Sequence, residues 1–539
     1  MFGRFSVGLL FCALLAVGDL GVASAQSINL RNANFMLVSE DLRLQKPGLS
    51  LDLTRTYNSR SLREGLFGFG WSTRFDTKLF IHADGTLLVE DGDGFRLRYT
   101  QDGRPWAEIR ALFVDRLIDA RKADDKSRGV ERNEQFYEEL SVLWKASADE
   151  REQATWLWDD AWVSPPDGEY ISYDRGTEKL EKRFDGFVRH RANGMVDKFD
   201  LRGRLVKAVD LAGRGAELVY DRDGRLVRIT HTDGANFTVQ TDAKRRITSL
   251  RDTAGRAVKY TYSKAGDLVQ VNGPGKRAMA YAYDEKHNLT ASREADGEAV
   301  QVIYDTEKDW AIALKKGAEV VQYRWVVEDG KGERFSVFVK HADGTETQHR
   351  FDQANHVEVE RQADGSEIRT LYSACCNKPL EVQYPDGKVA RYDYDAQARL
   401  VGFEQPDGTV VRYQYAPDAS LIVSASFSDG RRYGYGYDKS GRLKTVETAK
   451  SGKVALVYGR NGKVAKIEGD RGKYSLEYDL EGRPTVITGN SGAALRLRYG
   501  NGGQILSSQL ASPTGKDSDS FYRELSEVLD MLLPANGAL

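Results

Sequence analysis

The sequence predicts a mainly β protein in which one long antiparallel sheet curls on itself. The first observation is compositional: Gly and Tyr occur 52 and 26 times in 539 residues, whereas Met occurs only 5 times. The second is that Asp-Gly dipeptides, which favour tight turns, separate short stretches of alternating polar and apolar residues. The third is a unit that repeats at a nearly fixed spacing. A chain of this length exceeds one ordinary core, so a repeat array is expected.

The repeat is marked by a Tyr-Asp pair that is followed by Gly and Arg. It stands as YDRDGR from Tyr220, YDKSGR from Tyr437 and YDLEGR from Tyr478. On either side of an irregular stretch, 305–350, the anchors are spaced by 20 to 22 residues. The fourteen anchors are Phe199, Tyr220, Thr241, Tyr262, Tyr283, Tyr304, Phe351, Tyr372, Tyr394, Tyr415, Tyr437, Tyr458, Tyr478 and Tyr499.

Each repeat has the pattern of a β-hairpin. The Asp opens a turn that the Gly completes, and the Asp carboxylate can accept bonds from backbone amides of that turn. Residues 226–230 then alternate in polarity, which predicts a strand with one buried face. The TDGAN segment at 232–236 predicts a hairpin turn, after which a second strand leads to the next anchor. More than twenty such strands must twist into a curled sheet, either a β-shell or an open barrel.

The recurrence of Tyr-Asp argues for an architectural role of both residues. A catalytic acid–base pair occurs once per site, whereas this pair recurs along the array. We therefore interpret the Tyr as the end of a strand and the Asp as the cap of a turn. The residues assigned to these roles include Tyr220, Asp221, Tyr283, Asp284, Tyr394, Asp395, Tyr437, Asp438, Tyr478 and Asp479.

The N-terminus has the pattern of a secretory signal peptide, which we place at residues 1–25. A positive charge near the start precedes an apolar run at 7–17, and Ala-Ser-Ala at 23–25 offers a cleavage site. A membrane anchor is the alternative, but the run is short for a spanning helix and Asp19 interrupts its end. We therefore expect export to the periplasm, the cell surface or the medium, with no transmembrane segment in the mature chain.

Two parts of the chain resemble a known family. The repeats resemble the YD repeats of the Rhs family, which also occur in insecticidal Tc-toxin C components and in teneurins. Residues 27–99 resemble the domain that precedes the repeats in many Rhs proteins, through Tyr57-Asn58 and GFGWS at 68–72. The resemblance covers 27–104 and about 165–505, and it implies a hollow β-shell. Rhs toxins usually end in an autoprotease with Asp-Pro motifs and a toxin domain. None of the twelve prolines here follows an Asp, so neither part is carried over.

Five parts are expected along the chain: the signal peptide, an N-terminal β domain at 26–104, a helical insertion at 105–162, the YD-repeat array at 163–512 and a C-terminal amphipathic helix at 513–539. Apolar residues recur at helical spacing in the insertion and in the C-terminal part. FYEELS at 136–141 and FYRELS at 521–526 differ at one position. These two segments either dock in similar grooves and seal openings of the shell, or match by coincidence.

Four of the eight Trp residues lie close together in the helical insertion. They are Trp144, Trp156, Trp158 and Trp162. Their rings either dock the insertion on the shell, which we favour, or form a surface for a partner or ligand, because Trp is enriched in binding hot spots.

Cysteine and histidine give few signs of chemistry. Cys375 and Cys376 are adjacent, and neighbouring Cα atoms lie about 3.8 Å apart, closer than disulfides normally span. We favour a structural vicinal disulfide in an oxidising compartment over two free thiols, and intact-mass measurement after alkylation distinguishes them. None of the seven His residues has a metal-site spacing, and EDGDG at 90–94 lacks the remaining ligands of a calcium loop. No cofactor, metal or catalytic residue is therefore predicted.

These observations favour an exported, non-enzymatic shell or scaffold that binds or encloses a partner polypeptide, either cargo or an envelope protein. A cell-surface adhesin that binds carbohydrate is the alternative, and an unrecognised hydrolase is a third hypothesis. Lys and Arg number 78 against 80 Asp and Glu, a formal charge of −2, so nucleic acid is not an expected partner.

Asp221→Ala should weaken one hairpin without affecting the binding of a partner. Loss of a capping side chain costs about 0.5–2 kcal/mol, and we expect the loss to stay within that repeat. Hydrogen exchange should therefore speed up in 220–241 and remain unchanged in 437–458. Equal acceleration in both repeats would contradict the role of a local turn cap.

Overall fold

The computed structural model describes most of the chain after residue 23. The described residues are 24–44, 51–172, 178–191, 194–210, 213–274, 278–294, 297, 299–374, 378–395, 399–417, 421–439, 441–449, 452–459, 463–470, 472–479, 483–499, 505–511, 521, 522 and 525. The start of the expected signal peptide, both Cys375 and Cys376, and most of 513–539 lie outside them. The chain divides into a first unit, Met1–Thr73 with Val209–Leu539, and a second unit, Arg74–Ala208.

The first unit begins with a small sheet that we call the N-terminal sheet. Its strands are β1 (Ser24–Asn29), β2 (Asn34–Leu44), β3 (Leu51–Asn58) and β6 (Trp71–Ser72), paired in that order, and the short hairpin of β4 (Glu64–Gly65) and β5 (Gly68–Phe69) lies between β3 and β6 in the chain. Burial alternates along β3, where Leu51, Leu53, Arg55 and Tyr57 are buried. An Arg therefore occupies a position at which the alternation predicts an apolar residue.

The long sheet contains 36 antiparallel strands, β7–β42, that follow one another in sequence order. The sequence prediction of a mainly β protein with a long antiparallel sheet is confirmed, since strands make up 54% of the structure and there are three helices among the described residues.

Its first strands belong to the second unit. They are β7 (Lys78–Ile81), β8 (Leu87–Glu90), β9 (Arg96–Gln101), β10 (Gly168–Ser172), β11 (Lys179–Arg183), β12 (Gly186–His190), β13 (Val196–Phe199) and most of β14 (Leu205–Val209).

The remaining strands belong to the first unit. The next fourteen are β15 (Gly215–Tyr220), β16 (Leu226–His231), β17 (Asn236–Thr241), β18 (Ile247–Asp252), β19 (Ala257–Tyr262), β20 (Leu268–Asn272), β21 (Ala278–Tyr283), β22 (Leu289–Glu294), β23 (Val300–Tyr304), β24 (Ala311–Lys316), β25 (Glu319–Val327), β26 (Arg334–Lys340), β27 (Glu346–Asp352) and β28 (Val357–Arg361). The last fourteen are β29 (Glu367–Tyr372), β30 (Pro379–Gln383), β31 (Val389–Tyr394), β32 (Leu400–Glu404), β33 (Val410–Tyr415), β34 (Ile422–Phe427), β35 (Arg432–Tyr437), β36 (Leu443–Thr448), β37 (Gly452–Tyr458), β38 (Val464–Gly469), β39 (Gly472–Tyr478), β40 (Pro484–Gly489), β41 (Ala494–Tyr499) and β42 (Ile505–Ala511).

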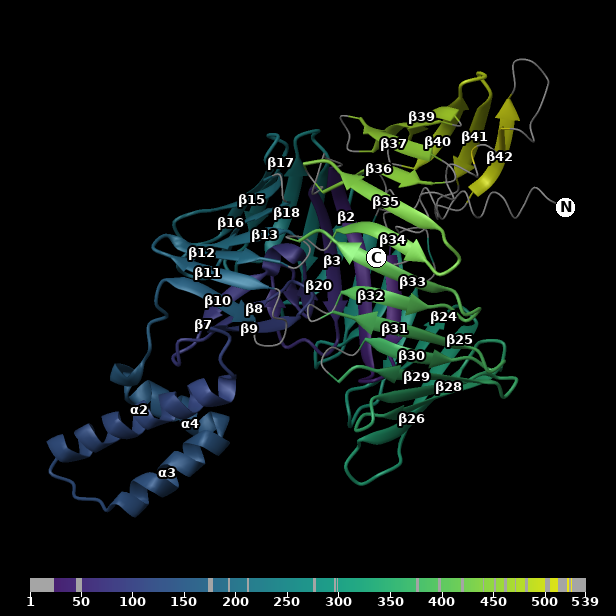
Figure 1. Cartoon of the computed structure of the whole chain (residues 1–539). Coiled ribbons are helices and arrows are strands. Elements are labelled where there is room, and N and C mark those ends of the chain that lie inside the picture. Colours follow the sequence, from purple (N-terminus) through teal and green to yellow (C-terminus); the bar gives the residue numbers. More distant parts are fainter. Residues whose placement is uncertain are drawn as a thin grey trace. The chain divides into compact units, whose positions relative to one another are not determined.

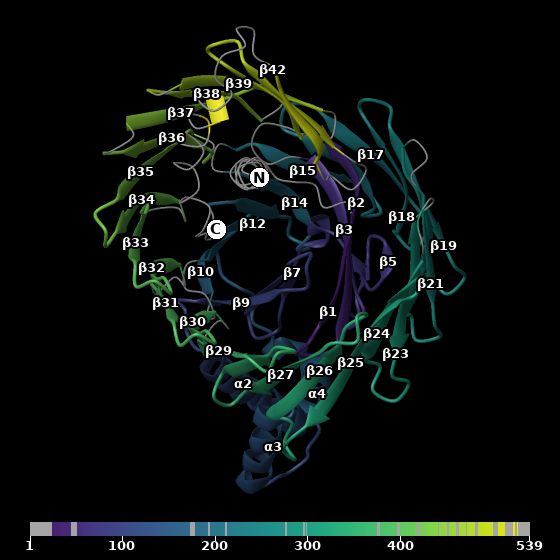
Figure 2. The same ribbon diagram turned by 90° about the vertical axis from the view of Figure 1, so that its right-hand side faces the viewer.

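A β-bulge at the anchor of most repeats accounts for the curvature of this sheet. The pairing register shifts by one residue at Tyr220, Tyr262, Tyr283 and Tyr437, among others. A bulge bends its strand and increases the local twist, so a bulge at a regular interval bends the sheet in one direction. Within the first unit, the strands from β17 to β42 follow a curved wall, and β1–β3 lie on the inner side of β18–β24 (Figure 2).

The second unit contains the helical insertion and the first eight strands of the long sheet. The helices are α2 (Trp106–Ser127), α3 (Glu134–Ala146) and α4 (Ala148–Leu157), and the 3-10 turns are η1 (Arg74–Asp76) and η2 (Asp159–Ala161). The side chain of Asn133 caps α3 and that of Ser147 caps α4. The helices form one group with their own core (Figure 1), which includes Phe113, Leu117, Tyr137 and Trp144.

The insertion lies between two strands that pair with each other. β9 and β10 are antiparallel neighbours although α2–α4 separate them in sequence. Strands β7–β9, which we expected in an N-terminal domain ending at 104, are therefore part of the long sheet, and the boundary of the first unit lies after Thr73. Strand pairing across an insertion is non-local, so a pattern read along the chain does not reveal it.

The start of the long sheet also folds back on itself within the second unit. Leu79 N donates to Gly203 O over 2.8 Å, and Lys78 and Arg204 form an antiparallel bridge. Gly203 has φ of +73°, and a Cβ atom at this position would lie 1.9 Å from Leu79 O. Both the backbone conformation and the close approach therefore require Gly here.

Gly203→Ala should disrupt this contact, because Ala has both the disfavoured φ and a clash. Gly213→Ala is the matched control, since Gly213 has φ of +76° and no atom within 4 Å of the added Cβ. The control should cost about 1–2 kcal/mol from backbone strain alone. Hydrogen exchange of residues 78–81 should accelerate in Gly203→Ala and not in Gly213→Ala. If both variants lose the same stability and neither changes the exchange of 78–81, the contact does not have this role.

Candidate functional site

The anchor Tyr residues bond successive repeats to each other. The hydroxyl of Tyr437 donates to the carbonyl of Ile422 over 2.7 Å, and that of Tyr478 donates to Val464 over 2.8 Å. The same bond joins Tyr262 to Ile247, Tyr304 to Leu289, Tyr415 to Leu400, Tyr458 to Leu443 and Tyr499 to Pro484. Each ring thus packs on the sheet while its hydroxyl satisfies a carbonyl of the preceding repeat.

The anchor Asp organises the turn and orients an Arg side chain. Asp438 accepts the backbone N–H of Arg442 (3.0 Å) and its Nε–H (2.7 Å), and the guanidinium then lies 4.2 Å from the ring centre of Tyr458. Asp395 holds Arg399 over Tyr415, and Asp479 holds Arg483 over Tyr499. This Asp–Arg–Tyr arrangement stabilises the turn and the cation–π contact together.

Two of the predicted anchors depart from this pattern. Asp221 accepts the backbone N–H of Arg225 over 2.8 Å, but the guanidinium turns to Asp223. Asp284 binds Asn288 in place of an Arg, and Tyr283 accepts a bond from the N-terminal sheet. Tyr220 and Tyr394 are half-buried, and the ammonium of Lys378 lies 5.1 Å from the ring centre of Tyr394.

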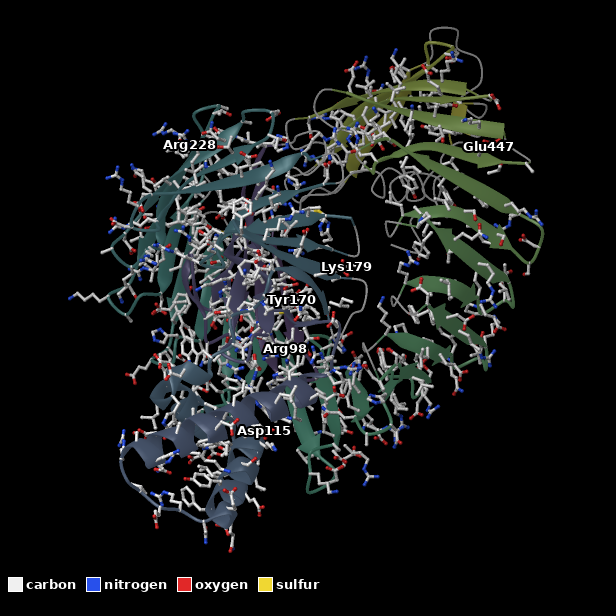
Figure 3. The ribbon with its side chains drawn as sticks, turned by 60° about the vertical axis from the view of Figure 1, so that its left-hand side comes forward. Arg98, Asp115, Tyr170, Lys179, Arg228 and Glu447 are labelled. Atoms are coloured by element: carbon white, nitrogen blue, oxygen red, sulfur yellow. The ribbon has the colours of Figure 1, made fainter. Side chains whose placement is uncertain are left out.

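The long sheet has an apolar inner face and a polar outer face. The residue two positions before the anchor lies on the inner face, and in several repeats it is also Tyr: Tyr260, Tyr281, Tyr392, Tyr413 and Tyr435. On the outer face most side chains are charged or polar, as at Arg228 and Glu447 (Figure 3), and a few exposed aliphatic residues such as Val219 and Val457 lie among them. The sequence signal for the inner face is the recurring Tyr-x-Tyr at the end of a strand, which the sequence analysis missed.

A buried ion pair attaches the N-terminal sheet to this inner face. Arg55 is fully buried, and it donates to Asp41 from Nε (2.5 Å) and Nη2 (2.8 Å). Its Nη2 also donates to Tyr281 OH over 3.3 Å, and Tyr260 OH donates to Asp41 over 2.7 Å. The guanidinium lies 4.6 Å from the ring centre of Trp71. Burial opposes the charge, but Asp41 holds the pKa of Arg55 above its usual value.

Further contacts extend this attachment along the inner face. Trp71 Nε1 donates to Tyr283 OH over 2.8 Å. Tyr57 OH donates to His287 O and accepts from Leu289 N, and burial raises its pKa. The irregular stretch 305–350 takes part, because Trp325 Nε1 donates to Leu30 O over 2.8 Å.

The end of the N-terminal sheet nearest the middle of the array is held by Arg31. It forms an ion pair with Glu358 at 3.1 Å, and its guanidinium lies 4.7 Å from the ring centre of Tyr372. The N-terminal part of the chain therefore covers the array from β18, where Ile247 N donates to Leu66 O, to β29.

The other end of the inner face is covered by the C-terminal segment. Its described residues, Phe521, Tyr522 and Leu525, are helical, and Phe521 and Leu525 are buried in the core formed by β33–β41. The ring of Phe521 meets that of Tyr474 edge-on at 6.0 Å. FYEELS at 136–141 packs differently, because there Tyr137 is buried in the helical group and donates to Asp125. The two matching segments therefore do not occupy similar grooves.

Between these two covers, aromatic rings of the inner face are half-exposed. The ring of Tyr392 stacks on that of Phe403 with the ring centres 4.8 Å apart, and the ring of Phe427 meets that of Tyr433 edge-on with the centres 5.6 Å apart. These four residues are half-buried, and we call them, with the buried Tyr435, the central aromatic face. The hydroxyl of Tyr435 is buried without a hydrogen-bond partner among the described residues, and burial raises its pKa.

Two parts of the chain match models of known protein families. A family model described as Teneurin YD-shell matches residues 182–314 and 335–516, more than half of the chain. The chain belongs to the teneurin YD-shell family. Residues 25–99 match a second model, a domain of unknown function (DUF6531). The resemblance to YD-repeat proteins that the sequence indicated is thereby confirmed. The stretch that the YD-shell model omits, 315–334, contains β25 and Trp325, which contact the N-terminal sheet.

Among solved structures, components of Tc toxins align with most of this chain. The complex of TcdB2 and TccC3 aligns with 92% of this YD-shell chain and 28% of its own chain, at 12% identity and a TM-score of 0.37. A mutant Tc holotoxin pore of Photorhabdus luminescens aligns with 90% and 26%, at 12% identity and a TM-score of 0.36. This chain therefore spans about a quarter of the length of these structures. No curated protein matches the sequence.

The second unit of this YD-shell protein contains another buried charge network. Arg189 is almost fully buried and forms ion pairs with Asp91 at 2.6 Å and Glu178 at 2.7 Å. Tyr99 donates to Glu178 and accepts from Arg189. Burial raises the pKa of Asp197, which pairs with Arg191 at 2.6 Å. The acidic segment at 90–94 thus supplies Asp91 to an ion-pair network, and the described residues contain no cluster of three metal-ligating side chains.

The four Trp residues of the insertion separate into two pairs. Trp144 is buried in the helical core and its ring lies 5.7 Å from that of Trp158, whereas Trp156 and Trp162 are exposed. In the part of the chain that the structure describes, no helix has the length and hydropathy that a membrane crossing requires.

Arg55→Met should loosen the N-terminal sheet, because it leaves Asp41 as a buried carboxylate without its cation. Removing one partner of a buried ion pair costs about 3–5 kcal/mol. Adding Asp41→Asn removes the orphaned charge and should restore part of the stability. Hydrogen exchange in 51–58 and limited proteolysis measure the effect.

The matched control is Arg412→Met, which breaks the exposed ion pair with Asp393. An exposed pair contributes about 0–1 kcal/mol. If both substitutions accelerate exchange in 51–58 equally, the buried pair does not attach the N-terminal sheet.

The array should lose stability between about pH 10 and 12. Burial raises the pKa of Tyr437, Tyr458 and Tyr499 to about 12, against about 10 in an unfolded chain. Their contribution is fully present below pH 10 and is lost as the pH rises through the folded pKa, since the unfolded chain then releases protons first. Tyrosinate absorbance at 295 nm should appear together with loss of the strand circular dichroism; titration near pH 10 with intact strands would contradict this.

Proposed function

We propose that this YD-shell protein is an exported, non-enzymatic scaffold that binds a polypeptide on the central aromatic face. The observation that supports the proposal most directly is the row of half-exposed rings at Tyr392, Phe403, Phe427 and Tyr433, which lies between two covered regions of the same inner face. Half-exposed aromatic rings on a curved sheet give apolar contact area with little side-chain entropy to lose on binding.

A polypeptide is favoured as the occupant because both neighbouring covers are themselves polypeptide. The N-terminal sheet places Trp71 and Tyr57 against the tyrosines of the inner face, and the C-terminal segment places Phe521 against Tyr474. An apolar segment of a partner chain can make the same kind of contact with Tyr392 or Phe427. The unpartnered hydroxyl of Tyr435 offers such a chain one buried polar contact.

The alternative occupant is a carbohydrate. Glycan adhesion by the outer face would require rows of exposed aromatic rings there, but among the described residues of the array the one exposed aromatic side chain is Phe184, in the turn between β11 and β12. The anchor Tyr-Asp pairs recur as parts of turns and inter-repeat bonds, which favours a scaffold over a hydrolase.

Export rests on the predicted signal peptide. Cleavage after residue 25 would leave Gln26 as the first residue, and the remainder of β1 would keep its pairing from Gln26 with Leu37 onward. Gln26 Nε2 also donates to Ser292 Oγ over 3.2 Å, so the new N-terminus would remain attached to the inner face.

Isolation of the tagged protein from its native envelope and medium tests this function. The wild type should retain a polypeptide that protects it from protease, with its own N-terminus at Gln26. Tyr392→Ser with Phe427→Ser should lose at least about tenfold of that polypeptide, because hot-spot aromatic truncations commonly reduce affinity by this amount.

The matched control changes the outer face of β31 and of β33, the neighbour of β34, through Arg391→Ser with Gln414→Ser. These residues are exposed, and the control should retain the polypeptide. Equal loss in both variants would contradict binding at the central aromatic face. Retention of a glycan without any polypeptide would favour the adhesin.

A further inference from the structure

The helical insertion exposes a second aromatic surface, separate from the array. Trp156 is 71% exposed, Leu157 is 70% exposed and Trp162 is 45% exposed. They lie at the end of α4 and directly after η2, all within the second unit. Large apolar side chains that gather at one exposed place are a feature of interaction sites rather than of scattered surface residues.

The geometry of this surface is already fixed without a partner. The rings of Trp156 and Trp162 meet edge-on with centres 6.1 Å apart. Trp162 Nε1 donates to Thr155 O over 2.9 Å, which fixes the orientation of its indole. The intervening Trp158 packs against the buried Trp144, with the two ring planes tilted by 42°. A partner would therefore find ordered rings, and little side-chain entropy would be lost on binding.

The rim of this surface is acidic. The exposed residues around it include Asp149, Glu150, Glu152, Asp159 and Asp160. Glu152 precedes Trp156 by one helical turn and shares its face of α4. Arg151 is the single basic residue in 147–162, and its guanidinium turns inward to donate to Trp144 O over 2.7 Å. From the neighbouring helix α2, the exposed Arg116 donates from Nε to Ala161 O over 3.2 Å, next to Trp162. The rim therefore sets five carboxylates against one exposed guanidinium, and acidic charge predominates.

We propose that this surface docks a cationic polypeptide segment that carries apolar anchors. The faces of Trp156 and Trp162 accept the aliphatic stems and charged heads of Lys or Arg through cation–π contacts, and the carboxylates complement the positive charge. An anionic lipid surface or a nucleic acid would be repelled by the same rim. A second copy would bring an identical acidic rim against this one, so self-association at this surface is disfavoured as well.

The test measures binding of a fluorescein-labelled amphipathic peptide of Lys and Leu to the full exported chain by anisotropy. The expected result is binding that weakens as salt rises, because the rim charges are solvent-exposed. Trp156→Ala with Leu157→Ala, and separately Glu152→Lys with Asp159→Lys, should each raise the Kd by about tenfold or more. A peptide of Lys and Ser, with equal charge and no apolar residue, should bind much more weakly.

Two control variants separate this surface from general effects. Phe184→Ala removes another highly exposed aromatic side chain of the same unit, and Glu131→Lys with Glu138→Lys reverses two exposed charges away from the Trp pair. Both should bind the peptide as the wild type does.

The proposal fails if these controls weaken binding equally, if the Trp156 variant binds normally, or if the Lys and Ser peptide binds as tightly. It also fails if anionic phosphatidylglycerol vesicles bind through Trp156, or if Trp156→Ala abolishes dimers of the chain. Each of these outcomes leaves the central aromatic face untouched, so the two proposals stand or fall separately.

Discussion

An antiparallel sheet that buries only one of its faces needs a cover for that face, and this requirement organises the first unit. The curved array has no second sheet of its own length to pack against. Its inner face is covered at one end by the N-terminal sheet, through Arg55 and Trp71, and at the other by Phe521 and Leu525. Each cover comes from a part of the chain that lies outside the repeats. The half-exposed rings between the covers follow from the same geometry, since the array extends further than its covers.

The identity of the anchor residue follows from two simultaneous demands. Its ring must pack on the inner face, and its hydroxyl must donate to a carbonyl of the preceding repeat, such as that of Ile422, which lies outside residues 424–426, the part of β34 that pairs with β35. Tyr meets both demands, whereas Phe at 199 and 351 meets only the first. The Arg of the preceding turn then lies over the ring of the Tyr, as Arg442 lies over that of Tyr458. Each repeat therefore stabilises the next through two contacts. Its carbonyl accepts the hydroxyl of the next Tyr, and its Arg lies over the ring of that Tyr.

The repeat, its hairpins and the helical insertion could be predicted from the sequence, because periodicity and turn residues are local signals. The pairing of β9 with β10 could not, since an insertion of three helices separates them. The burial of Arg55 had a signal: in LDLTRTYN it occupies the phase of Leu51, Leu53 and Tyr57. Its partners on β19 and β21 lie more than 200 residues away, however, and no local pattern identifies them. The division of the Trp residues depends on where α4 ends, which helical spacing alone does not determine.

A buried Arg also solves a difficulty that repeats create. Hairpins of similar shape offer the N-terminal sheet several equivalent docking positions, and apolar packing alone discriminates poorly between them. Arg55 needs Tyr hydroxyls or rings from two adjacent repeats, which Tyr260 and Tyr281 provide. At the same position in the other early repeats stand Leu218, Val239 and Val302. A shift by one repeat in either direction would place an aliphatic side chain against the buried guanidinium, and an incompletely paired buried charge is costly. The ion pair therefore determines where on the array the N-terminal sheet docks more than it increases the stability of the docked sheet.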